Sequence, residues 1–215
     1  MSSARAEQPG QERAAGDFLR LQRDLAQGHA LVRGEHSSLI TVSGPDRLTW
    51  LNSLITQDVL GLTPHQTVES LLLSPQGRIE HAFFLSDDGQ TTWILTTTKP
   101  AEGLEAWLRS MVFRMDVSIE RLENVDIVAG TSDALLTGLG AVMVFSDPWP
   151  RVGTGSVGYA EDLHPGNGWE LHWAVIQKGT RVSSEVLPAE YLEALLIAAA
   201  RPTVKDVDET TLPHE

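Results

Sequence analysis

The sequence contains no cysteine, and this absence excludes several kinds of chemistry from the chain itself. Disulfide bonds, thiolate nucleophiles and cysteine ligation of zinc or iron–sulfur clusters all require a thiol. Long apolar runs are also missing, because no segment reaches the roughly 18 consecutive apolar residues of a transmembrane helix. The N-terminus lacks the apolar segment of a secretory signal. We therefore expect a cytoplasmic protein that does not associate with membranes.

Positive charge is scarce as well. The chain has 16 Lys and Arg against 29 Asp and Glu, which gives a formal net charge of −13. Nucleic acids and anionic membrane surfaces would be repelled overall by this charge, so we expect neither as a partner. The hydrophobic content of 41% and the charged content of 21% are ordinary for a globular protein, and they predict a folded central region.

Composition and periodicity divide the chain into four expected parts. Residues 1–16 are polar and predict a disordered leader, and residues 205–215 form an acidic tail. Residues 17–130 predict a first α+β subdomain, and residues 131–204 predict a second, loop-rich one. The order of the predicted elements is typical of an α+β fold with mainly antiparallel sheets and helices packed on one face. Strands are expected at 30–32, 39–42, 67–73, 79–85, 91–97, 117–119, 125–129, 142–145 and 170–176, and helices at 18–25, 44–56, 99–113, 132–139 and 188–200.

The stretch from Ser43 to Asp58 combines a helix start with a polar ending. Pro45 fits the first turn of a helix, and apolar residues recur at helical spacing from Leu48 onwards. We expect this helix to stop near Thr56, where three polar residues follow one another. From the pattern alone, an amphipathic helix on a sheet explains the stretch more often than a ligand site does.

A second stretch, Ser70 to Asp88, predicts a β-hairpin whose turn is Ser74-Pro75-Gln76-Gly77. Together the two stretches resemble the folate-binding YgfZ/GcvT-like family, the relatives of the glycine cleavage T-protein. That family carries a helix of the type D-x-x-x-F-L-x-x-x-x-T-[NQ]-D-V, followed by a strand and an x-x-G-[GRK]-[IV] hairpin. The matching residues, in order, are Asp46, Leu51, Thr56, Gln57, Asp58, Val59, Gly77, Arg78 and Ile79.

The resemblance implies a GcvT-like folate-binding fold with tetrahydrofolate as the cofactor. The folate would lie where the end of the central helix meets the hairpin. Gln57, Asp58 and Gln76 would offer hydrogen-bonding groups there, and Arg78 would be a counter-charge for the glutamate tail. His81, next on the hairpin strand, is a further candidate for contact with the cofactor and the one candidate for catalysis.

The chain departs from the family at two places. The aminomethyltransferases of this family carry paired aspartates on the hairpin, at positions that align here with His81 and Ala82, and this argues against aminomethyl transfer. The segment Asp208 to Glu215 resembles a D-x-x-T-x-P-x-E stretch of the family, but the sequence ends before the K-G-C-Y-x-G-Q-E signature. We therefore expect a truncated member, or one whose C-terminal half lies on a separately encoded chain.

Three functions remain as hypotheses. The first is a tetrahydrofolate-binding protein that supports assembly or repair of iron–sulfur enzymes, with those client proteins as partners. The second is a folate-dependent aminomethyl or one-carbon transferase in which His81 handles the proton. The third is a non-catalytic remnant or interaction module. Without its C-terminal half, the helix expected at 188–200 would expose apolar surface, so we expect self-association or partner binding.

Other suggestive residues are explained without a ligand. The spacing of His164 and His172 matches no metal motif, so no metal site is expected. Tryptophans at positions 149, 169 and 173 could stack on a pterin, but they are more often core residues. The glycine-rich run 153–158 is interpreted as a loop.

Overall fold

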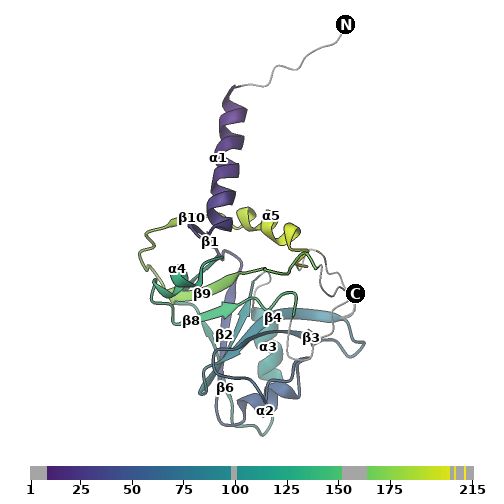
Figure 1. Cartoon of the computed structure of the whole chain (residues 1–215). Helices are drawn as coiled ribbons and strands as arrows, with labels where there is room; N and C mark the ends of the chain where they lie inside the picture. Colours follow the sequence, from purple (N-terminus) through teal and green to yellow (C-terminus); the bar gives the residue numbers. More distant parts are fainter. Residues whose placement is uncertain (1–8, 98–100, 152–163, 204–205, 207–210, 212–215) are drawn as a thin grey trace.

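The computed structural model describes residues 9–97, 101–151, 164–203, 206 and 211. Within these residues the chain forms two five-stranded sheets, seen one above the other in Figure 1. Sheet A has the strand order β10-β1-β7-β9-β8, and sheet B has the order β3-β4-β5-β2-β6. The strands of sheet A are β1 (Ala30–Arg33), β7 (Val125–Gly130), β8 (Met143–Ser146), β9 (His172–Gln177) and β10 (Glu185–Leu187). Those of sheet B are β2 (Ser38–Ser43), β3 (Thr67–Leu73), β4 (Ile79–Asp87), β5 (Thr91–Thr96) and β6 (Ser118–Leu122).

Sheet B is antiparallel throughout, and two helices cover one of its faces. In β3 the residues Val68, Ser70 and Leu72 are buried in alternation, as expected for a strand with one face on a core. Helices α2 (Arg47–Asn52) and α3 (Glu102–Ser110) bury Trp50 and Leu104 against that face. The α+β class with mainly antiparallel sheets is confirmed.

Sheet A is covered on both faces. The short helix α4 (Asp133–Thr137) packs Leu136 against one face. On the other face lie the ends of α1 (Pro9–Ala26) and α5 (Glu190–Ala198), which meet where the rings of Phe18 and Tyr191 stand 4.7 Å apart. The N-terminal part of α1 extends away from the rest of the molecule (Figure 1). Within the described residues, no helix has the length and apolarity needed to cross a membrane.

The two sheets share a core. Phe84 and Leu95 of sheet B pack in the same cluster as Phe145 and Trp173 of sheet A. Phe145 is fully buried, with no exposed surface. This contact fixes the hairpin β3–β4 relative to sheet A, and the hairpin is where the sequence resemblance predicts ligand contact.

Strand pairing follows a different division of the chain from the expected subdomains. Strands β1 and β7, which precede residue 131, belong to sheet A, and the whole of sheet B lies between them in the sequence. Residues 9–16, expected to be disordered, belong to helix α1, because the helical segment begins at Pro9. Residues 1–8, the glycine-rich run 153–158 and almost all of the segment from Asp208 to Glu215 lie outside the described residues.

Candidate functional site

The central helix α2 is shorter than the sequence predicts, since it ends at Asn52 and not near Thr56. At the end of the helix, polar side chains form hydrogen bonds with backbone amide and carbonyl groups. The Asn52 side-chain oxygen accepts a hydrogen bond from the Val59 amide at 2.9 Å, and the Ser53 hydroxyl donates to the Trp50 carbonyl at 2.7 Å. Such local bonds favour a turn over continued helix. The apolar residues Leu54 and Ile55 still pack on the core, but from a turn.

The turn after α2 is attached to the edge of sheet B. The Thr56 amide donates to the Leu71 carbonyl at 3.1 Å, and the Leu71 amide donates to the Thr56 hydroxyl at 2.9 Å. Strand β3 is the edge strand, so Thr56 satisfies backbone groups that would otherwise have no strand partner. Gln57 and Asp58 therefore lie beside β3. Gln57 is half-buried and Asp58 is exposed, with one carboxylate oxygen accepting from the Leu60 amide at 3.0 Å.

The hairpin turn has the expected chemistry. The Ser74 hydroxyl accepts from the amides of Gln76 and Arg78, at 3.3 and 3.1 Å, and Gly77 has a φ of +81° that few other residues adopt. Gln76 is exposed at the tip of the turn, and Arg78 is half-buried on the returning side. The strand register shifts between Leu72 and Leu73, which is a bulge just before this turn.

His81 and Ala82 point to opposite faces of sheet B. His81 pairs with Leu72, which packs in the core under α2 and α3, and its ring lies beside Gly103 of α3. A Cβ atom on Gly103 would stand 3.4 Å from the His81 ring. Ala82 is exposed on the face that also carries Phe84. A folate on either face would therefore meet only one of these two positions, and neither position holds a carboxylate.

An ion pair sets the position of α2. Arg47 donates two hydrogen bonds to Asp87, at 2.9 and 2.8 Å, and Thr92 and the Gly89 amide also donate to this carboxylate. Burial raises the pKa of Asp87, but these hydrogen bonds and the Arg47 charge outweigh burial and hold the pKa below its ordinary value. Because Asp87 ends strand β4, the pair ties the start of α2 to the sheet.

A buried charged cluster between the two sheets was not predicted. Arg201, just after α5, donates to Glu69 of β3 at 2.9 Å and to Asp147 after β8 at 3.0 Å. These side chains are 9%, 17% and 2% exposed, respectively. Burial raises the pKa of Glu69, and attraction to Arg201 offsets this only in part.

Aromatic rings enclose the cluster. The Arg201 guanidinium stands 5.3 Å from the centre of the Trp149 ring and 5.7 Å from that of Phe84. The Trp169 indole donates to Asp147 at 3.0 Å, and the Trp149 indole donates to the Ala199 carbonyl at 2.9 Å. Both tryptophans thus serve as packing residues, as interpreted from the sequence. Through these contacts Arg201 links Glu69 of sheet B to Asp147, which follows β8 of sheet A.

His164 and His172, the two histidines considered above as metal ligands, each contact a neighbouring protein group. His164 accepts from the Gly166 amide at 2.9 Å, and His172 lies 2.9 Å from the Ser146 hydroxyl. Within the part of the chain that the structure describes, no three His, Asp or Glu side chains gather as a metal site would require.

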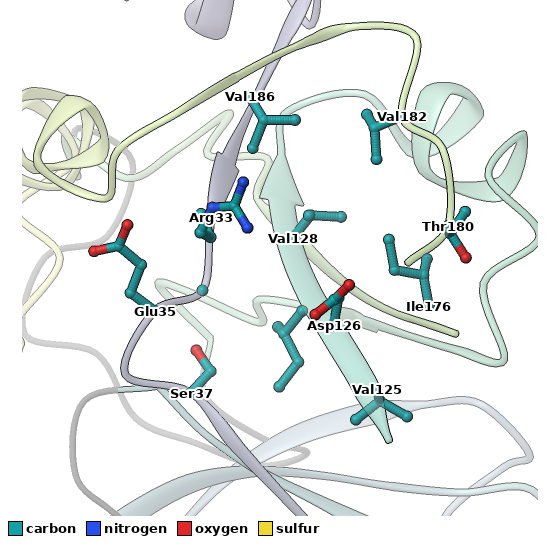
Figure 2. Close-up of a pocket in the computed structure, with 12 residues that line it drawn as sticks. Arg33, Glu35, Ser37, Val125, Asp126, Val128, Ile176, Thr180, Val182 and Val186 are labelled. Carbon is teal, nitrogen blue, oxygen red and sulfur yellow. The ribbon is translucent and has the colours of Figure 1, made fainter. Parts of the chain in front are cut away.

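A cavity of about 490 Å³ lies on sheet A and not at the hairpin (Figure 2). It opens on the face that also carries α4, away from the core shared with sheet B. Gln57, Asp58, Gln76, Arg78 and His81 do not line it. The structure therefore brings the end of α2 beside β3 and the hairpin, and it separately forms a cavity that the sequence did not indicate.

Comparisons with known proteins agree with this fold. Neither the comparison with family models nor that with curated proteins found a match. Among solved structures, a similar one is the glycine cleavage system aminomethyltransferase T from Bartonella henselae, with a TM-score of 0.56 and 18% sequence identity. The alignment covers 86% of this chain and 49% of that one, so the chain spans about half the length of its structural neighbour. The protein has a GcvT-like α+β fold.

Proposed function

We propose that this protein binds tetrahydrofolate where the end of α2 meets the β3–β4 hairpin. The observation that carries the proposal is the attachment of Thr56 to β3 at Leu71 within a GcvT-like fold. This attachment holds Gln57 and Asp58, the residues of the T-Q-D motif, beside the hairpin that bears Arg78. The fold resembles that of an aminomethyltransferase, and the same two segments carry the sequence resemblance.

The side chains suit a pterin with an acidic tail. Gln57 supplies an amide that both donates and accepts, and Asp58 keeps one carboxylate oxygen beyond the one bonded to Leu60. Gln76 and Arg78 lie at the hairpin turn, where Arg78 would meet the glutamate tail. His81 lies on the sheet face that carries α2, and it would contact the ring from that side.

We infer further that the protein does not transfer an aminomethyl group. The positions of the paired aspartates hold His81 and Ala82, on opposite faces of the sheet. The physiological role we propose is support of iron–sulfur enzymes, through folate and through a partner that supplies the K-G-C-Y-x-G-Q-E segment. The chain itself has no thiolate with which to hold a cluster.

Isothermal titration with tetrahydrofolate under anaerobic conditions tests the binding. Removal of the Arg78 charge (Arg78→Met) and of the amide (Gln57→Ala) should each weaken binding by about tenfold or more, the worth of one charge-assisted or buried hydrogen bond. Gln90→Ala is the matched control, because Gln90 is exposed at the other end of β4. Absence of binding, with and without a chain carrying the K-G-C-Y-x-G-Q-E segment, would contradict the proposal.

The alternative function is folate-dependent one-carbon transfer, because the similar solved structure is that of an aminomethyltransferase. A transfer assay with a folate one-carbon donor separates the two. We expect no turnover by the intact protein. Turnover that disappears in His81→Ala would establish the transferase instead.

A further inference from the structure

One side chain closes the loop that follows α2. Asn52 is the last residue of the helix, and its side-chain oxygen accepts a hydrogen bond from the Val59 amide at 2.9 Å. This bond joins the two ends of residues 53–58, the closed loop, which contains the T-Q-D motif. The Val59 side chain is fully buried in the core under α2 and α3, so this end of the closed loop has a fixed place.

A second attachment holds the middle of the closed loop. The amide and the hydroxyl of Thr56 both bond to the backbone of Leu71 on strand β3. Between Thr56 and Val59 lie only Gln57 and Asp58. Two residues between two fixed points have few backbone conformations available to them. The closed loop therefore presents the Gln57 and Asp58 side chains from a backbone that is ordered before a ligand binds.

The chemistry of the Asn52 side chain allows its contribution to be isolated. A side-chain amide accepts through its oxygen and donates through its nitrogen. The Asn52 oxygen is used by Val59, and the nitrogen bonds to no group in the described part of the chain. An aspartate at this position would therefore keep the bond that closes the loop, whereas an alanine would remove it.

We propose that Asn52 is a positioning residue for the folate site, an inference that rests on the proposed function. Asn52 closes the loop and so holds Gln57 and Asp58 in the conformation that contacts the pterin, without touching the ligand itself. A ligand that meets an ordered loop loses less conformational entropy on binding than one that must order the loop. Without the closing bond, a smaller fraction of molecules has the binding conformation, and the apparent affinity falls by that fraction.

Tetrahydrofolate titrations of three variants of the full chain test this role. Asn52→Ala should weaken binding about five- to tenfold, the worth of one hydrogen bond, and Asn52→Asp should restore most of the parent affinity. Gln66→Ala is the matched control. The Gln66 side-chain oxygen accepts from the Thr63 amide at 3.2 Å, in the same connection between α2 and β3 but beyond the closed loop. This variant should bind folate as the parent does.

A double-mutant cycle separates positioning from a general effect on the fold. The background for the cycle carries Gln57→Ala and Asp58→Ala, which remove the side chains that the closed loop presents. In this background Asn52→Ala should weaken binding no further. Hydrogen exchange of the Val59 amide reports loop closure without any ligand. Exchange should be slow in the parent and in Asn52→Asp, and faster in Asn52→Ala.

Any of three results overturns the inference while leaving the folate site in place. The first is equal affinity of the parent and Asn52→Ala. The second is an Asn52→Asp protein that binds as weakly as Asn52→Ala, because the Asn52 nitrogen would then contact folate directly. The third is an undiminished loss from Asn52→Ala in the background without Gln57 and Asp58. Absence of folate binding by the parent overturns the proposed function and this inference together.

Discussion

Replacement of Arg201 by methionine should destabilise the protein more than any surface substitution. The change keeps the aliphatic stem but leaves Glu69 and Asp147 buried with no cation between them. Breaking a buried ion pair from one side costs about 3–5 kcal/mol, because the stranded charge keeps its desolvation penalty. With a denaturant slope of about 2–3 kcal/mol/M, this predicts a fall of about 1–2.5 M in the urea midpoint.

The assay is urea unfolding followed by tryptophan fluorescence, since two tryptophans touch the cluster. Arg20→Met is the control, because the Arg20–Asp24 pair joins side chains that are 54% and 30% exposed. Pairs of this kind contribute about 0.5 kcal/mol or less. The substitution Glu69→Gln, added to Arg201→Met, should recover part of the loss, because it removes one of the two stranded charges.

The pH dependence gives a second test of the same reasoning. Without Arg201, burial and the charge of Asp147 both act on Glu69 and both raise its pKa, so the folded pKa should rise further above the unfolded value. A raised carboxyl pKa adds stability below the unfolded pKa of about 4.3, and this is lost as pH rises through the folded pKa. The difference between variant and parent should therefore shrink from pH 7 to about pH 5. A loss of about 0.5 kcal/mol or less for Arg201→Met, no larger than that of Arg20→Met, would refute the account.

Further predictions concern α2 and α5. Asp87→Asn should cost about 3 kcal/mol and flatten acid denaturation below about pH 4, because a depressed carboxyl pKa adds stability above the unfolded value and loses it as pH falls. Gly44→Ala should lower the melting temperature, since Gly44 has a φ of +113° and a Cβ there would stand 2.2 Å from the Asp116 carbonyl; Gly61→Ala, at an open position, is its control. Ile197, 74% exposed on α5, should support self-association or partner binding, so Ile197→Asp should shift light scattering toward monomer.

Local pattern predicted the elements whose neighbours are close in sequence. Strand β3 was predicted with the same bounds as observed, because its alternation and the following turn lie within one hairpin. Strand β10 was missed because its three residues are too few to show an alternating apolar pattern. Its partner is β1, a parallel strand that lies far away in the sequence. The end of α2 was misjudged, because Leu54 and Ile55 keep helical spacing while Asn52 bonds forward to Val59.

In the candidate site, too, features formed by residues close in sequence could be predicted, and features formed by distant residues could not. The hairpin turn and the T-Q-D segment could be found from local motifs, whereas the placement of His81 on the face under α2 and α3 is known only from the structure. The Arg201 cluster could not be found, because its three charges come from β3, from the end of β8 and from beyond α5. The local sequence shows only that Pro148 follows Asp147 and Pro202 follows Arg201, and a proline indicates a turn or a helix end and not a buried charge.

The placement of sheet B between β1 and β7 has a consequence for synthesis on the ribosome. All strands of sheet B are complete once Leu122 has emerged, and its pairings join segments within that one stretch. Strand β1 is made earlier, but its first partner, β7, follows the whole of sheet B, and its second, β10, is among the last elements made. The nascent chain therefore carries Leu31 and Val32 unpaired while sheet B folds. This interval is when a chaperone would recognise β1, and when a premature release would leave sheet A open along both edges of that strand.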